Sequence, residues 1–124
     1  MFSGKRVLFV DDEPSIRLTL PPVLQQHGFE VRSAATVNDA LDEINSCRFD
    51  VLLSDLNISV EGDGVLVVKA MRHLQPNCVT VILTGHPEFG GVEDIEVDDY
   101  MVKPADVDSL VRLLRKKLLD NKRN

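Results

Sequence analysis

Cysteine is scarce in this sequence, and the positions of the two cysteines argue against several kinds of site. Cys47 and Cys78 form no CxxC pair and belong to no Cys/His pattern of the zinc-binding kind. We expect both to be reduced thiols, because disulfides are rare in the cytoplasm, where we expect the protein to work. The sequence therefore predicts neither a disulfide scaffold nor a structural zinc.

Positive charge is also limited, and long apolar runs are missing. The net charge of -6 argues against direct nucleic-acid binding, which needs a basic surface to neutralise phosphates. No apolar run approaches the length of a membrane span, and Lys5, Arg6 and Asp11 bracket the only early one, so neither a signal peptide nor a membrane segment is predicted. The chain has no GxxxxGK[ST] loop, no GxGxxG turn after its first strand, and no Ser/His/Asp or Cys/His arrangement.

The remaining composition is that of a folded domain. Hydrophobic residues make up 44% of the 124 positions and charged residues 27%, which is ordinary for a globular protein. We therefore expect a single domain over residues 1–124, with a core of about 5–120. The stretch 121–124 is interpreted as a basic tail or the start of a linker.

Short apolar runs alternate with helical patterns along the chain, which predicts an α/β fold with a parallel sheet. The predicted strands are 5–10, 30–34, 51–55, 79–83 and 100–102. The predicted helices start at Pro14, after Thr36, near Gly64 and near Ala105. Pro21-Pro22 predicts a kink or local break in the first helix, and the weak pattern between 86 and 99 allows a short helix or turn at most.

Polar residues stand at the ends of four of the five predicted strands. Asp55 is a carboxylate directly after the apolar run 51–54. Taken alone, an aspartate in this position is typical of a turn or a helix cap. Ligands bind at the carboxyl ends of parallel strands, so the other strand-end residues favour a site instead. These residues are Asp11, Asp12, Thr84 and Lys103.

The residue types at these ends suit phosphoryl chemistry. Three carboxylates without His or Cys favour a hard cation, Mg²⁺ or alternatively Mn²⁺. Lys103 supplies a fixed positive charge and Thr84 a hydroxyl donor, which together fit a tetrahedral dianion. Asp55, as the central acid, is then the candidate nucleophile.

Four segments carry a resemblance to a known family. VLFVDDEPSIR, VLLSDLN, VILTG and DDYMVKP resemble the signature segments of the bacterial response-regulator receiver domain of two-component signalling. The resemblance implies a flavodoxin-like (βα)5 sandwich with strand order 2-1-3-4-5. It also implies that a sensor histidine kinase or a histidine phosphotransfer protein phosphorylates Asp55, so that the chain catalyses only its own phosphorylation and dephosphorylation and is no turnover enzyme.

The same resemblance assigns a role to each site residue. It makes Asp12, Asp55 and the backbone carbonyl of Asn57 direct metal ligands, with Asp11 acting mainly through metal-bound water. It pairs Lys103 with the phosphoryl oxygens. It further implies a switch made by Thr84 and Tyr100, and control of the phosphoryl lifetime by Asn57 and His86.

The chain departs from the family pattern in three places. One is Pro21-Pro22 in the first helix, and the other two lie after Asp55 and after Thr84. Ile58-Ser59 stands where the family usually has Met-Pro, and the stretch from Thr84 to Lys103 is short and acidic, so the fourth helix is expected to be short or degraded. This keeps open a pseudo-receiver that acts without phosphorylation. A small phosphatase with an aspartyl nucleophile is disfavoured by Asn57, since such enzymes usually place an acid there. An output domain in a longer chain and a homodimer also remain open.

Overall fold

The computed structural model describes residues 4–58, 63–85, 97–103 and 106–120. Five strands form one sheet: β1 (Arg6–Val10), β2 (Glu30–Ala34), β3 (Val51–Asp55), β4 (Val79–Thr84) and β5 (Asp99–Val102). The helices of the described ranges are α1 (Pro14–Gln26), α2 (Val37–Ser46), α3 (Gly64–Leu74) and α4 (Val107–Asp120). The predicted alternation of strands and helices is confirmed.

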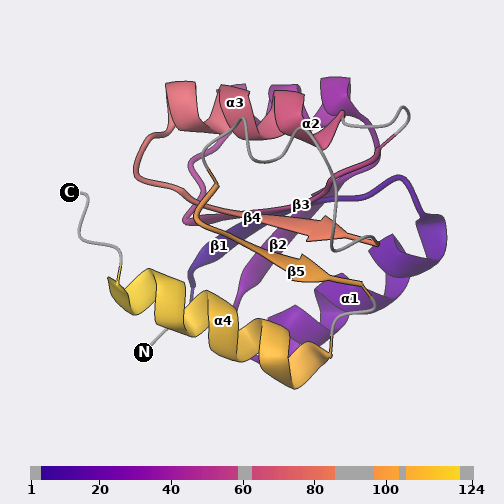
Figure 1. Cartoon of the computed structure of the whole chain (residues 1–124), viewed down its shortest axis with the longest axis vertical. Helices are drawn as coiled ribbons and strands as arrows, with labels where there is room; N and C mark the ends of the chain where they lie inside the picture. The colour runs from indigo at the N-terminus through magenta and orange to yellow at the C-terminus, as the bar shows by residue number, and fades with distance from the viewer. Residues whose placement is uncertain (1–3, 59–62, 86–96, 104–105, 121–124) are drawn as a thin grey trace.

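The sheet is parallel throughout, and its strand order is β2-β1-β3-β4-β5. α2 and α3 cover one face, while α1 and α4 cover the other (Figure 1). Every residue of β3 and β4 is buried, because helices cover both faces of these central strands. The predicted flavodoxin-like fold is confirmed.

Each face of the sheet has its own apolar cluster. Ile44 of α2 and Met71 of α3 pack with Leu52 and Ile82 on one face. Leu24 of α1 and Leu114 of α4 pack on the other face, where β3 contributes Leu53. Alternate residues of a strand thus serve opposite faces, and this fixes the register that brings the strand ends to one edge.

The first helix differs from the prediction in one respect. α1 runs through Pro21 and Pro22 without a break, although each proline removes a backbone donor. Pro21 and Leu24 are the buried residues of this helix, and Leu24 packs in the apolar cluster of this face of the sheet. Packing of this face holds the helix together, since tertiary contacts supply most of a helix's stability in a protein.

The structure tests one further helix prediction, and another falls almost wholly outside the residues that it describes. The hydroxyl of Thr36 accepts a hydrogen bond from the Asp39 N–H at 3.0 Å and caps α2, so the predicted helix start after Thr36 is confirmed. The expected short or degraded fourth helix, over 92–97, falls almost wholly in residues 86–96, outside the described residues. Of that stretch the structure describes Val97, which packs against the cluster formed by α2 and α3. No helix in the described ranges is long and apolar enough to cross a bilayer.

Candidate functional site

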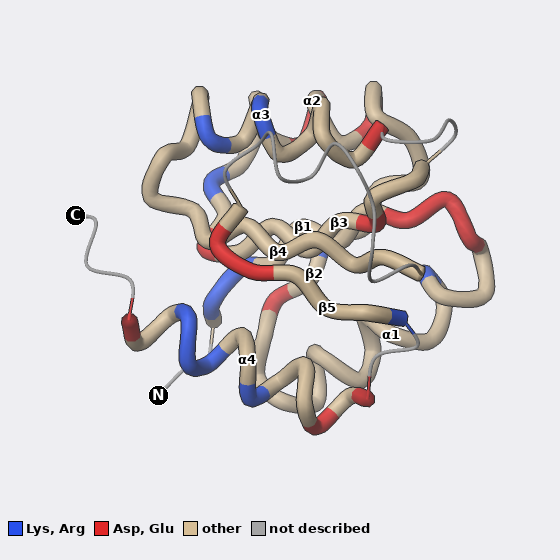
Figure 2. The backbone as a smooth tube through the Cα atoms, in the orientation of Figure 1, with Lys and Arg blue, Asp and Glu red and all other residues tan. Residues whose placement is uncertain are grey.

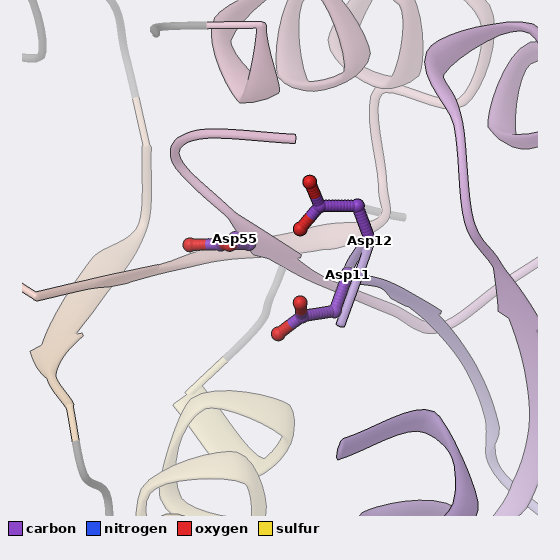
Figure 3. A group of neighbouring side chains, drawn as sticks. All are labelled: Asp11, Asp12 and Asp55. Carbon is purple, nitrogen blue, oxygen red and sulfur yellow. The ribbon is translucent and has the colours of Figure 1, made fainter. Parts of the chain in front are cut away.

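Three carboxylates meet at the carboxyl edge of the sheet. Asp11 directly follows β1, Asp12 comes next, and Asp55 is the last residue of β3. One oxygen from each carboxylate lies within 4.8 Å of the others (Figure 3). Asp11 is fully buried, Asp55 is 8% exposed and Asp12 is exposed to solvent.

Strand register explains why these acids meet. β1 and β3 are parallel neighbours, and Val10 stands opposite Ser54, so the residue after each lies at the same level. The Asp11 N–H still bonds to Ala34 O of β2 at 3.1 Å, which holds the turn in line with the sheet. Figure 2 shows acidic residues at the ends of β1 and β3, on the edge where the basic end of β5 also lies.

Lys103 supplies the positive charge at this edge. Its backbone N–H donates to Thr84 O at 2.6 Å, which extends the pairing of β4 with β5 by one residue. Its Nζ lies 3.2 Å from Asp11 Oδ2 and 3.4 Å from Asp55 Oδ2. One ammonium group therefore bridges two carboxylates that would otherwise repel each other.

Asp11 has partners on both of its carboxylate oxygens. Oδ2 faces Lys103, and Oδ1 accepts the Glu13 N–H at 2.9 Å. Its backbone carbonyl accepts a hydrogen bond from Arg17 Nη1, also at 2.9 Å. The two contacts to Oδ1 and Oδ2 compensate for burying the carboxylate. Asp12 makes no ion pair or side-chain hydrogen bond within the part of the chain that the structure describes, so its oxygens remain available to a ligand.

Burial and neighbouring charges oppose each other at Asp55. Burial raises the pKa of the Asp55 carboxyl; Asp11 adds to the increase, while Lys103 and the Asn57 N–H reduce it. For Lys103, burial lowers the pKa, but the carboxylates of Asp55 and Asp11 outweigh burial and hold that pKa above its ordinary value. Extra positive charge near Asp55 would therefore favour its ionised form.

The remaining predicted residues lie in different positions relative to the acids. Thr84 is buried at the end of β4, and Asn57 is exposed two residues after Asp55. Tyr100 is 50% exposed on the edge strand β5, opposite Ile82 in register. Neither Thr84 nor Tyr100 lines the cleft that holds the acids. His86 lies outside the described residues.

The acids open into a cleft of about 610 Å³ between α1, α4 and the strand ends. Its described lining includes an apolar part formed by Ile16, Leu20, Leu83 and Leu110. Sequence reasoning did not place Ile16, Leu20 or Leu110 in the candidate site. The available signal was that Ile16 and Leu20 lie one turn apart on the helix that begins directly after the acids.

The donor set fits a hard divalent cation. The cluster offers carboxylate oxygens without His or Cys, and it combines one exposed acid with two buried ones. Such oxygen ligands suit Mg²⁺ or Mn²⁺ rather than zinc. The coarse prediction of an acidic metal-binding cluster agrees with this arrangement.

Fold and site together define a class: a doubly wound α/β domain with a carboxylate cluster and a lysine at the carboxyl edge of its sheet. The chain matches the response regulator receiver domain family over residues 7–115. It belongs to that family. Its function is that of a receiver domain in two-component signal transduction, as the resemblance implied.

A relative of similar length and a much longer relative both support this membership. The chain is 30% identical over 118 residues to sporulation initiation phosphotransferase F of Bacillus subtilis (strain 168), a match that covers 93% of this chain and 94% of the relative. It is 31% identical over 113 residues to DNA-binding transcriptional regulator NtrC of Proteus hauseri, covering 89% of this chain and 24% of the relative. The chain thus spans about a quarter of the length of NtrC.

Solved structures of receiver proteins are similar over almost the whole chain. Chemotaxis response regulator CheY4 of Vibrio cholerae has a TM-score of 0.81 at 31% identity, covering 92% of this chain and 98% of that one. Response regulator TrrA of Thermotoga maritima, in complex with Mg²⁺ and BeF, has a TM-score of 0.79 at 29% identity, covering 90% and 97%.

Proposed function

We propose that this single receiver domain accepts a phosphoryl group on Asp55 from the phosphohistidine of a sensor kinase or a phosphotransfer protein. The observation that carries the proposal is the position of the Lys103 ammonium, which bridges Asp55 and Asp11 beside the exposed Asp12. An aspartate that served only as a turn or cap would need no such arrangement.

The reaction is an in-line displacement at phosphorus. A carboxylate oxygen of Asp55 forms the new P–O bond while the P–N bond to the donor imidazole breaks. The bonding pair stays on the imidazole nitrogen, which takes up a proton from solvent. Hydrolysis by water later returns free Asp55, so the domain catalyses only its own phosphorylation and dephosphorylation.

Each site residue has a proposed role. Asp12, Asp55 and the Asn57 carbonyl would hold Mg²⁺, which would offset the charge of the transferring group. Asp11 acts through metal-bound water, because Lys103 and the Glu13 N–H already occupy its oxygens. Lys103 turns from carboxylate to phosphoryl oxygens, and the buried Thr84 hydroxyl bonds to the new dianion. His86 and Asn57 tune the lifetime of the phosphoryl group.

Signalling would follow from the new charge. A dianion at Asp55 biases an existing two-state equilibrium, in which Thr84 moves toward the phosphoryl group and the Tyr100 ring turns inward. We propose that this takes place in the cytosol. An output domain in a longer chain, or a homodimer, would read the changed surface.

Intact mass spectrometry tests the proposal. We expect incubation with Mg²⁺ and acetyl phosphate or phosphoramidate to add one phosphoryl group, which Asp55→Asn abolishes. The matched control is Asp42→Asn, an exposed aspartate of α2 that should leave the adduct unchanged. Failure of wild type to form any adduct, and to bind beryllofluoride, would favour the pseudo-receiver. Release of phosphate from many equivalents of a monoester would favour the phosphatase.

A further inference from the structure

The first residue of α3 lies directly against the backbone that carries the proposed phosphoacceptor. Gly64 is buried, and its N–H donates to Leu56 O at 2.7 Å. A Cβ atom built at position 64 would overlap Asp55 O and would lie only 2.8 Å from Leu56 O. No side chain fits at position 64 unless the helix or the strand end moves.

Space, and not an unusual backbone conformation, is what demands glycine here. The described glycines with positive φ are Gly4 and Gly28, so Gly64 lies outside the left-handed backbone region that favours glycine. The three nearest atoms that a Cβ would meet all belong to the backbone, and a rotamer change cannot move them aside. A side chain at position 64 could therefore be accommodated only by a shift of the backbone.

The backbone of β3 cannot move easily to make room for a side chain at position 64. β3 lies between β1 and β4, and the Leu56 N–H bonds to Leu83 O of β4 at 2.8 Å. The displacement would fall on the turn after Asp55 and on the start of α3. That turn contains Asn57, whose N–H bonds to the Asp55 carboxylate.

We propose that Gly64 is a positioning residue for the phosphorylation site. Its missing side chain allows α3 to hold the turn 55–57 where the Asp55 carboxylate and the Asn57 carbonyl face the same cation. This inference rests on the proposed function, because it concerns the cation site assigned there. Residues that orient metal ligands in this way typically affect metal affinity by about 10- to 100-fold.

The experiment separates positioning from plain stability. Mg²⁺ dissociation constants are measured by isothermal titration calorimetry for wild type, Gly64→Ala and two controls, alongside thermal unfolding of each protein. Val67→Ala removes buried side-chain volume from the same helix and adds no atom against the backbone of the turn. Gly85→Ala adds the same methyl group where no atom lies within 4 Å.

We expect Gly64→Ala to weaken Mg²⁺ binding by about 10- to 100-fold. Val67→Ala should lower the unfolding temperature while its Mg²⁺ affinity stays within twofold of wild type, and Gly85→Ala should change neither quantity. If Gly64→Ala is poorly folded, the titrations of all four proteins are repeated in trimethylamine oxide, which favours compact states without supplying a metal ligand.

Two results would overturn the proposal. If Gly64→Ala binds Mg²⁺ within twofold of wild type, or loses no more affinity than Val67→Ala, then Gly64 matters to stability alone. If wild type itself neither binds Mg²⁺ nor accepts a phosphoryl group, the proposed function fails and takes this inference with it. The wild-type titration therefore distinguishes the two failures.

Discussion

The Nζ atom of Lys103 lies 3.4 Å from Oδ2 of Asp55, and this contact joins the ends of β5 and β3, which are not neighbours in the sheet. Lys103 is therefore placed by its own bond to Thr84 O rather than by pairing with β3. In the proposed reaction, this ammonium group would move from the carboxylates to the oxygens of the phosphoryl group.

Replacing Lys103 should separate metal binding from phosphoryl transfer. Lys103→Met removes the cation that stabilises the transferring group, so we expect phosphorylation by acetyl phosphate to slow by about 10²-fold. Mg²⁺ binding should stay equal or tighten, because the remaining carboxylates are no longer neutralised. Timed mass spectra and calorimetry measure the two quantities. Phosphorylation within twofold of wild type would contradict the assigned role of Lys103.

Asp55 should make stability depend on pH in an unusual direction. Burial raises the pKa of Asp55 in the folded protein, so this carboxyl favours folding below the pKa of the unfolded chain. That contribution is lost as pH rises through the folded-state pKa. Without metal, Asp55→Asn should therefore be more stable than wild type at neutral pH, by about 1 kcal/mol, with the gain disappearing in acid.

Mg²⁺ should reverse this order. A cation that binds only the folded state adds about 2.7 kcal/mol when its concentration is 100 times the dissociation constant, and Asp55→Asn loses a ligand for it. Urea unfolding across pH, with and without Mg²⁺, measures both effects. An Asp55→Asn variant that is less stable than wild type at every pH without metal would contradict the burial argument.

The sequence predicted the acids better than it predicted their surroundings. Apolar runs ending in Asp11 and Asp55 identify strand ends, and parallel pairing then forces those ends to one edge of the sheet. The close packing of Gly64 against Asp55 could not be foreseen, because it depends on where α3 starts in three dimensions. Of the kink or local break expected at Pro21-Pro22, the break did not occur, since local rules do not weigh the burial of that face.

Gln75 is a second residue whose role sequence patterns did not reveal. Its Nε2 donates to Ile44 O at 2.9 Å and to Cys47 O at 2.6 Å, and its Oε1 accepts the Phe49 N–H at 2.8 Å. One side chain thus ties the end of α2 to the segment that leads into β3. Its partners are all backbone groups, which no pattern of residue types reveals.

We expect Gln75→Glu to lower the free energy of unfolding by about 2–3 kcal/mol, because a carboxylate would face two carbonyl oxygens that lose their donor. The matched control is Gln25→Glu on the exposed face of α1, with an effect within about 0.5 kcal/mol. Urea unfolding measures both changes. The Mg²⁺ affinity should not change, since Gln75 lies beyond the end of α3 opposite Gly64; an equal stability loss in the two variants would contradict this account.

Tyr100 offers a direct test of the proposed switch. It is the only tyrosine in a chain without tryptophan, so intrinsic fluorescence comes essentially from this one ring. In the structure Tyr100 is 50% exposed on an edge strand. Iodide should therefore quench its fluorescence readily in the unmodified protein.

Adding Mg²⁺ and beryllofluoride, which mimics the phosphoryl group on Asp55, should reduce this quenching as the ring turns inward. Thr84→Ala should bind beryllofluoride with the ring still exposed, because the hydroxyl that couples the site to the ring is missing. Asp55→Asn should show no change at all, since it cannot form the complex. If wild type binds beryllofluoride while the quenching stays constant, the switch does not pass through Tyr100, and the signal leaves the site by another part of the surface.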